Sequence, residues 1–192
     1  AAQAQTMPEV QVLCQTLLAN AVGRAVQAIE TEALSQPDAD ARDFATTLLI
    51  GVTRPMIADG HDLYACYSVG DGVMALYQPA QSVTLLSVGD SGEFAGQTRF
   101  LTVDVLNEEE LAQRCQIRLA PAGQCLLLMT DGVSDPFFDS DNQLQGVEAW
   151  DGLWQALQHG QALDNEHNLL AWLAFWSAGN HDDRTLVVLR QT

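Results

Sequence analysis

QCLLLMTDGVSD, residues 124–135, is the stretch that decides the fold. Its five apolar residues from Cys125 to Met129 are typical of a strand that is buried on both faces. The strand runs out into Asp131, where Gly132 provides a turn signal. Asp135 follows four residues later, close enough to share a site with Asp131 if the chain turns into a helix there.

The same design, a carboxylate at the end of an apolar strand, occurs twice more. Asp71 ends the run YSVGDG of residues 67–72, and Asp182 with Asp183 precedes the apolar strand at 185–189. Each Asp-Gly pair alone is ordinary turn chemistry. Hard divalent cations, however, require several carboxylate oxygens that converge from separate segments, and the edges of adjacent strands supply that geometry. Together these acids favour a metal site.

Outward from these strands the pattern predicts an α+β protein. Apolar residues at helical spacing predict a long amphipathic helix over residues 10–29, and Asn107 followed by three glutamates predicts a short one. Two further helices are expected at 147–158 and 166–178, with their tryptophan pairs facing a sheet. The strands are expected at 44–52, 63–69, 73–77, 124–130 and 185–189, with turn signals at Asp59-Gly60 and Asp71-Gly72 that indicate antiparallel pairing.

Composition limits the function classes. The 192 residues are 47% hydrophobic, with a mean hydropathy of +0.01, which predicts one soluble globular domain spanning residues 1–192. The formal net charge of −17 would repel a phosphate backbone, so nucleic acid is not an expected partner. The excess of acids suits divalent cations, although an acidic solubilising surface accounts for most of these side chains.

The cysteines and the apolar runs indicate a compartment. Four cysteines lie scattered without CxxC spacing, as expected of reduced core thiols: Cys14, Cys66, Cys115 and Cys125. No apolar run approaches the roughly 18 residues of a membrane span, and the start of the chain lacks the features of a signal peptide. A cytoplasmic protein with no membrane partner is therefore expected.

Four short motifs occur one after another along the chain. They are TTLL at 46–49, SVGDG at 68–72, LLMTDGV at 127–133 with Asp135, and DDRTLVV at 182–188. This series resembles the ordered motifs of metal-dependent protein phosphatases of the PPM (type 2C) family. The resemblance runs from Asp43 to the end of the chain, the C-terminal two thirds of the family domain. It implies an αββα sandwich, two antiparallel sheets flanked by helices, with metal ions at one end between the sheet edges.

The resemblance also implies a site and a reaction. Asp131 and Asp182 would be ligands of a central binuclear site, and Asp71 and Asp135 would correspond to ligands of a third, more weakly held ion. Two or three Mn²⁺ or Mg²⁺ ions would then activate a water that attacks the phosphorus of phosphoserine or phosphothreonine in a phosphorylated protein. No phosphoenzyme is needed in such a hydrolase.

Departures from the family pattern leave two hypotheses open. The family's Asp-Gly-x-Gly motif and its phosphate-gripping basic residue have no counterpart before Phe44, so no catalytic residue beyond the metal ligands is assigned. Gly72-Val73 stands where many members have Ser-Arg, which suggests a divergent bacterial-type branch. Either a missing N-terminal segment or partner chain completes the sheet and the site, or the protein is a catalytically impaired pseudophosphatase that acts as a regulatory binding module.

Two other motifs are interpreted differently. Gly89-Asp90-Ser91-Gly92 resembles the nucleophile setting of trypsin-like proteases, but His61 is the only histidine upstream, in a polar turn, and paired cysteines are absent. Residues 88–102 are expected instead to form the variable flap beside the phosphatase site. His181, next to Asp182, is interpreted as a solvated loop histidine, with a role as ligand or proton donor as the alternative.

Overall fold

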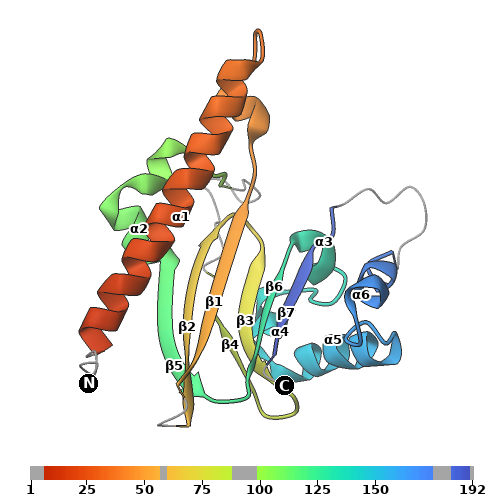
Figure 1. Cartoon of the computed structure of the whole chain (residues 1–192). Helices are drawn as coiled ribbons and strands as arrows, with labels where there is room; N and C mark the ends of the chain where they lie inside the picture. The colour runs from red at the N-terminus through yellow and green to blue at the C-terminus, as the bar shows by residue number, and fades with distance from the viewer. Residues whose placement is uncertain (1–6, 57–59, 88–98, 175–182, 191–192) are drawn as a thin grey trace. The chain divides into compact units, whose positions relative to one another are not determined.

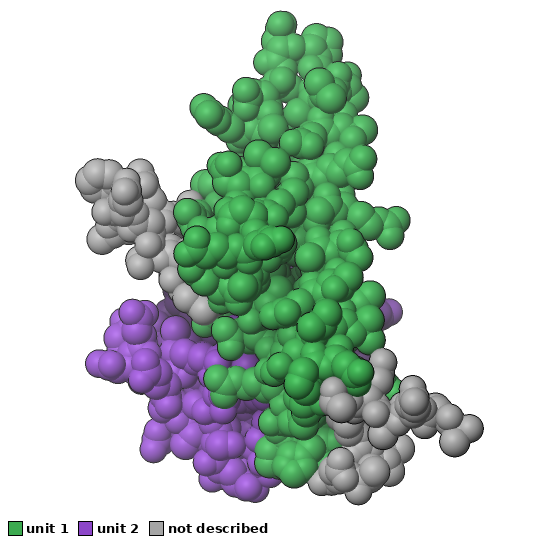
Figure 2. Space-filling model, turned by 90° about the vertical axis from the view of Figure 1, so that its left-hand side faces the viewer, with its two compact units in different colours: residues 1–71, 87–122 green, residues 72–86, 123–192 purple. Residues whose placement is uncertain are grey.

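The computed structural model describes residues 7–56, 60–87, 99–174 and 183–190. The chain divides into two compact units, residues 1–71 with 87–122 and residues 72–86 with 123–192 (Figure 2). Each unit has its own antiparallel sheet and its own hydrophobic cluster. The expectation of one domain over residues 1–192 stays a prediction.

The first unit contains a three-stranded sheet in the order β1-β2-β5 (Figure 1). Its strands are β1 (Leu48–Met56), β2 (His61–Val69) and β5 (Cys115–Pro121), all antiparallel. Gly60 ends the β1–β2 connection with φ +66°, a conformation that glycine adopts without steric cost. The hairpin turn expected at this point is therefore confirmed for its described part, since residues 57–59 lie outside the described residues.

Helices pack on this sheet. They are α1 (Met7–Ser35), η1 (Ala41–Phe44), η2 (Val103–Leu106) and α2 (Glu108–Arg114). Leu18, Val22 and Val26 of α1 are buried in one cluster with Tyr67 and Val69 of β2. The predicted long amphipathic helix and the short acidic helix are both present, and the Asn107 side chain accepts a hydrogen bond from the Glu110 N–H at 2.9 Å.

Helix α1 bears on the expectation of no membrane partner, which stays a prediction. Over 18 of its residues the mean hydropathy is 1.2, and by length and composition alone this is enough to cross a membrane, which the sequence interpretation had excluded. The interpretation missed it because the apolar residues are interrupted by polar ones instead of forming one run. The core helix of a soluble protein meets the same criterion, and three α1 residues are buried against β2.

The second unit contains a four-stranded antiparallel sheet in the order β4-β3-β6-β7. Its strands are β3 (Val73–Gln78), β4 (Ser82–Leu85), β6 (Cys125–Met129) and β7 (Leu186–Leu189). The helices of the unit are α3 (Asp131–Ser134), α4 (Asp141–Gln145), α5 (Val147–His159) and α6 (Glu166–Trp172). Every residue of β6 is buried, as the apolar run predicted.

Helix α5 supplies the core of this unit. Trp150 is 1% exposed and Trp154 is 9% exposed, and both rings lie against Tyr77 of β3, with centroids 6.2 and 5.5 Å away. The prediction that this tryptophan pair faces the sheet is confirmed. Trp172 is partly buried against the same cluster, whereas Trp176 lies outside the described residues.

The predicted α+β class, with two antiparallel sheets flanked by helices, is confirmed. Several boundaries were wrong. The first strand begins at Leu48 instead of Phe44, because residues 41–44 form a 3-10 turn with a capping box between Asp40 and Asp43. Strand β5 was missed, since its mostly part-exposed residues carry no clear alternation.

Candidate metal centre

Asp131 and Asp135 occupy one helical turn at the end of β6. Asp131 is the first residue of α3, and its Oδ1 atom accepts a hydrogen bond from the Gly132 N–H at 2.8 Å. The Asp135 N–H donates to the Asp131 carbonyl oxygen at 2.8 Å, so the two residues are one turn apart. The helical turn that the sequence interpretation required for these two acids is therefore present, with Asp131 partly buried and Asp135 exposed.

Thr130 joins this turn to the segment that leads into β7. Its Oγ1 hydroxyl donates to the Asp183 carbonyl oxygen at 2.9 Å and accepts from the Thr185 N–H at 3.0 Å. The Thr130 N–H also donates to the Thr185 carbonyl oxygen at 3.1 Å. These three hydrogen bonds hold the start of the DDRTLVV motif beside the end of β6.

Gly132 allows a close approach of the same two segments. A Cβ atom at this position would lie 2.5 Å from the Asp183 carbonyl oxygen, well inside van der Waals contact. The glycine of the Asp-Gly pair is thus required by tertiary packing, in addition to any role in the turn. Asp182 lies outside the described residues, as does His181, but Asp182 is bonded directly to Asp183.

Asp71 belongs to the first unit, and it is an exposed residue two positions beyond the end of β2. The preceding Gly70 has φ +108°, and a Cβ atom there would overlap the Thr47 side chain. The TTLL and SVGDG motifs therefore contact each other at one end of the β1–β2 pair. The Gly70 conformation sets the direction in which the chain leaves β2 at Asp71.

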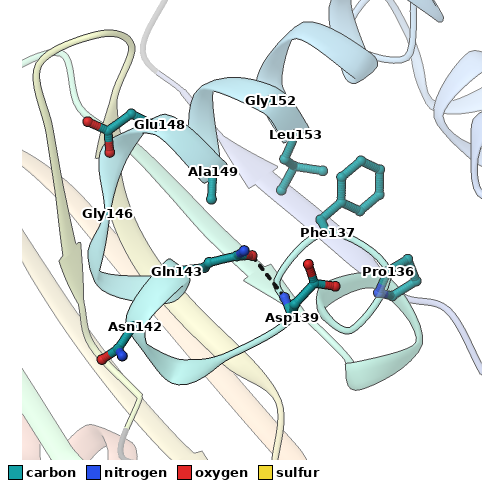
Figure 3. Close-up of a pocket in the computed structure, with 10 residues that line it drawn as sticks. All are labelled: Pro136, Phe137, Asp139, Asn142, Gln143, Gly146, Glu148, Ala149, Gly152 and Leu153. Carbon is teal, nitrogen blue, oxygen red and sulfur yellow. Dashed lines mark hydrogen bonds between the residues drawn. The ribbon is translucent and has the colours of Figure 1, made fainter.

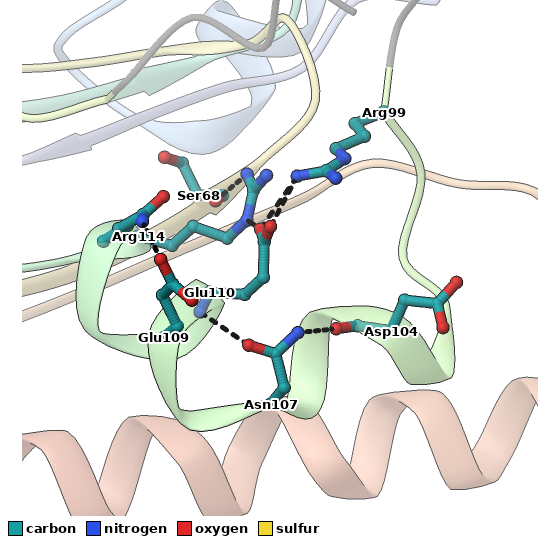
Figure 4. Close-up of polar contacts among 8 residues, drawn as sticks. Ser68, Arg99, Asp104, Asn107, Glu109, Glu110 and Arg114 are labelled. Carbon is teal, nitrogen blue, oxygen red and sulfur yellow. Dashed lines mark hydrogen bonds and ion pairs between the residues drawn. The ribbon is translucent and has the colours of Figure 1, made fainter.

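A buried arginine near this motif escaped the sequence analysis. Arg114 is 5% exposed; its Nη1 atom donates to the Ser68 carbonyl oxygen at 3.3 Å and its Nε atom to Glu110 Oε2 at 3.0 Å (Figure 4). Arg99 donates to both Glu110 oxygens at 2.8 and 2.9 Å. The i,i+4 spacing of Glu110 and Arg114 was the sequence signal that could have revealed this cluster.

The two arginines stabilise the charged form of Glu110. Burial by itself favours the neutral acid, but the hydrogen bonds and positive charges of Arg99 and Arg114 outweigh it, so the pKa of Glu110 is lowered. The cluster connects Arg99, which belongs to the expected flap segment, to α2 and to the Ser68 carbonyl oxygen of β2. Residues 88–98 of the flap, including the Gly89–Gly92 motif, lie outside the described residues.

The donor chemistry of the candidate site suits a hard divalent cation. Asp131 and Asp135 offer carboxylate oxygens, the ligand type that Mn²⁺ and Mg²⁺ prefer, and Asp183 is held next to them. The described residues contain no group of three or more His, Cys, Asp or Glu side chains placed to hold a metal ion. The structure therefore brings together part of the predicted ligand set, Asp131 with Asp135, while Asp71 is in the other unit.

Comparisons with known proteins bear on the family to which the chain belongs. The phosphatase domain of the cell fate determinant SpoIIE from Bacillus subtilis matches over 99% of this chain, at 15% identity and a TM-score of 0.41. The match covers 74% of that domain in a manganese-presoaked structure and 76% in a second structure. No curated protein matches. A family model described as Protein phosphatase 2C matches residues 2–174, so the chain belongs to the protein phosphatase 2C family.

Proposed function

We propose that the protein is a metal-dependent serine/threonine phosphatase that acts on phosphorylated proteins in the cytoplasm. Family membership supports the phosphatase chemistry. The observation that carries the proposal is the packing of Asp131-Gly132 against Asp183, because it joins two of the predicted metal-binding segments at one end of the β6–β7 pair. The four unpaired cysteines are consistent with a reducing compartment.

In this proposal Asp131 and Asp182 hold the two central ions, and Asp71 and Asp135 hold a third. When bound, Mn²⁺ or Mg²⁺ supplies an activated water and neutralises charge on the phosphoryl group. The residues of the chain itself set the positions of these acids. Thr130 fixes the Asp183 backbone, Gly132 lets it approach, and the α3 turn sets the spacing of Asp131 and Asp135.

The remaining ligands are proposed to come from a further segment or a partner chain. Strand β1 lies at an edge of the described sheet, pairing with β2 alone among the described strands. An additional strand placed there would satisfy its outer backbone groups. In this proposal the additional strand contains the Asp-Gly-x-Gly motif and the basic phosphate-binding residue, neither of which occurs before Phe44.

Metal-dependent hydrolysis with an Asp131→Asn variant tests the proposal. We expect turnover of p-nitrophenyl phosphate and a phosphothreonine peptide in millimolar Mn²⁺, and none with EDTA. The substitution removes a negative ligand with little change in shape, and we expect a loss on the order of 100-fold or more, since even outer-shell partners of metal ligands contribute roughly 10–100-fold. Asp164→Asn, an exposed acid of the same unit, is the matched control.

The negative outcome is equally specific. If the folded chain shows no Mn²⁺-dependent turnover, the proposal that this chain is an active enzyme fails. The regulatory binding module then becomes the better interpretation of the same fold. If Asp131→Asn retains full activity, the assignment of Asp131 as a ligand fails while the phosphatase activity stands.

A further inference from the structure

Helix α1 of the first unit has an exposed apolar side in addition to the side that packs on its sheet (Figure 1). Leu18, Val22 and Val26 form the buried side, spaced four residues apart, and they lie in one cluster with residues of β2. Leu13 and Leu17 point elsewhere and are 44% and 59% exposed. The N-terminal half of α1 therefore has a second apolar side that is open to solvent.

The residues of this side have the spacing of a helix-pairing seam. They recur at alternating intervals of three and four residues, which keeps them on one stripe of a helix. All but the half-buried first one are exposed. This stripe, the α1 seam, consists of Val10, Leu13, Leu17, Asn20 and Arg24.

Charges stand at the two ends of the seam and are absent between them. Glu9 lies at one end and Arg24 at the other, and residues 10–23 contain no charged side chain, although the whole chain has a net charge of −17. Depletion of charge is typical of the core of a protein–protein interface. The helical rise of 1.5 Å per residue places the two charges about 22 Å apart along the axis, with Leu13 and Leu17 between them.

This order of charges is complementary to itself. If two α1 helices lie antiparallel about a two-fold axis between residues 16 and 17, Glu9 of each copy faces the partner's Arg24. The two Leu17 side chains then meet beside the axis, and each Leu13 lies one turn away. A parallel pair would instead bring the two Glu9 carboxylates together and the two Arg24 guanidinium groups together, which is unfavourable. The charges therefore favour the antiparallel arrangement.

The cleft of the second unit offers no such complementarity. It has a volume of about 630 Å³ and is formed by the segment after α3, by α4 and by α5 (Figure 3). The carboxylates of Asp139 and Glu148 point to opposite sides of it. The Phe137 ring is stacked on Trp172, with centroids 5.8 Å apart. The charged groups of the cleft thus do not converge on one ligand, and the α1 seam is the surface better suited to recognition.

We propose that the protein forms a symmetric dimer in which the α1 seams of two copies pair antiparallel. Because such an interface uses the same surface of both copies, each Glu9–Arg24 pair occurs twice. A membrane surface suits α1 less well, since helices that lie on anionic membranes carry several basic residues on the polar face. Arg24 is the one basic residue of α1. The inference does not depend on phosphatase activity.

Sedimentation velocity over a range of about 1 to 200 µM protein tests the proposal. We expect a monomer–dimer equilibrium with a Kd on the order of 10 µM, because a single helix pair is at the small end of interface sizes. Leu17→Glu places two carboxylates beside the axis and should raise the Kd at least about 10-fold. Val12→Glu is the matched control, since Val12 is 63% exposed on α1 outside the seam and should keep the parent Kd.

Charge reversal tests the antiparallel arrangement itself. Arg24→Glu and Glu9→Arg should each raise the Kd about 10-fold, because each brings two like-charge pairs together. The double variant Glu9→Arg/Arg24→Glu restores both pairs with their signs exchanged, and its Kd should return to within about threefold of the parent value. Urea unfolding checks that these surface substitutions leave the fold intact.

Several outcomes would overturn the dimer. A parent chain that is monomeric at about 200 µM excludes it, as does an equal effect of Val12→Glu and Leu17→Glu. A double charge-reversal variant that dimerises no better than the single variants excludes the antiparallel pairing. Binding of a monomeric parent chain to vesicles of phosphatidylcholine and phosphatidylglycerol, lost in Leu17→Glu, would assign the seam to a membrane instead. None of these assays uses a phosphorylated substrate, so their results are independent of the phosphatase proposal.

Discussion

At the level of single residues, two glycines beside the predicted metal-binding acids have a role in tertiary packing. Gly70 places its Cα against Thr47, and Gly132 places its Cα against the Asp183 carbonyl oxygen. In each case the neighbour is far away in sequence, and an added methyl group would overlap it. The Asp-Gly pairs at 71–72 and 131–132 look alike in the sequence. Packing nevertheless requires Gly70, which precedes Asp71, at the first pair and Gly132, which follows Asp131, at the second.

Gly132→Ala should destabilise the protein by about 1–3 kcal/mol, because either the Asp183 backbone or α3 must move to accept the new Cβ atom. The free energy of unfolding from urea denaturation measures this cost. Gly23→Ala is the control, since nothing lies within 4 Å of its Cβ position in α1 and alanine should stabilise that helix by roughly 0.5–1 kcal/mol. Equal stability of the Gly132→Ala variant and the parent chain would contradict the close approach.

At the level of elements, α2 is fixed by charge as well as by apolar packing. Its Leu111 packs against the cluster around β2, while Glu110 and Arg114 connect the helix to Arg99 and to the Ser68 carbonyl oxygen. The sequence predicted the helix from its Asn107 cap and its acidic first turn. It could not predict the buried Arg114, because the Ser68 carbonyl oxygen that accepts its hydrogen bond lies 46 residues earlier in the chain.

Glu110→Gln should lower the free energy of unfolding by about 1–3 kcal/mol at neutral pH, since it weakens the partner of a buried arginine. The folded-state pKa of Glu110 is below its ordinary value of 4.5, so the charged acid stabilises the fold above about pH 4.5. This contribution is lost as the pH falls through the folded-state pKa. The stability difference between parent and variant should therefore shrink on acidification.

Thermal unfolding at several pH values from 3 to 7, in the range where the chain folds reversibly, measures this difference. Glu108→Gln removes a charge from the same first turn of α2, where no hydrogen bond to an arginine is present in the described structure. We expect a small change that does not follow the same pH profile. A difference for Glu110→Gln that stays constant down to pH 3 would count against the ion cluster as its origin.

At the level of the whole molecule, each compact unit buries one cysteine in its sheet. Cys66 of β2 is 0% exposed and Cys125 of β6 is 6% exposed, whereas Cys14 and Cys115 are only partly buried. Burial raises the pKa of the Cys66 thiol to about 12, and it also raises the pKa of Cys125. All four thiols are unpaired, as the scattered spacing predicted.

Alkylation of the native protein at pH 8 should therefore spare Cys66 and Cys125. We expect Cys66 to react on the order of 100-fold more slowly than in urea, because both the thiolate population and access are low. Peptide mass spectrometry after timed labelling gives the rate at each cysteine, and the urea-unfolded chain provides the reference. Native rates for Cys66 equal to those of Cys14 would show that the first sheet is not closed around it.

The sequence by itself determined the elements whose signals are local. The buried strand β6, the tryptophan pair of α5, the Asn107 cap and the acids at the strand ends are all recorded in neighbouring residues, through apolar runs, 3.6-residue spacing and turn chemistry. The ordered motifs that these acids belong to were enough to indicate the family. Strand β5 was missed because its residues show no alternation and its identity depends on pairing with β2.

Only the tertiary structure decided which distant segments meet. The contact of Gly132 with Asp183 and the hydrogen bond of the buried Arg114 to the Ser68 carbonyl oxygen each join residues that carry no mutual signal in the chain. Such contacts depend on how the strands are ordered and paired. The packing of the whole unit decides that order, and no short stretch of the sequence encodes it. The acids could therefore be named in advance, but their immediate neighbours could not.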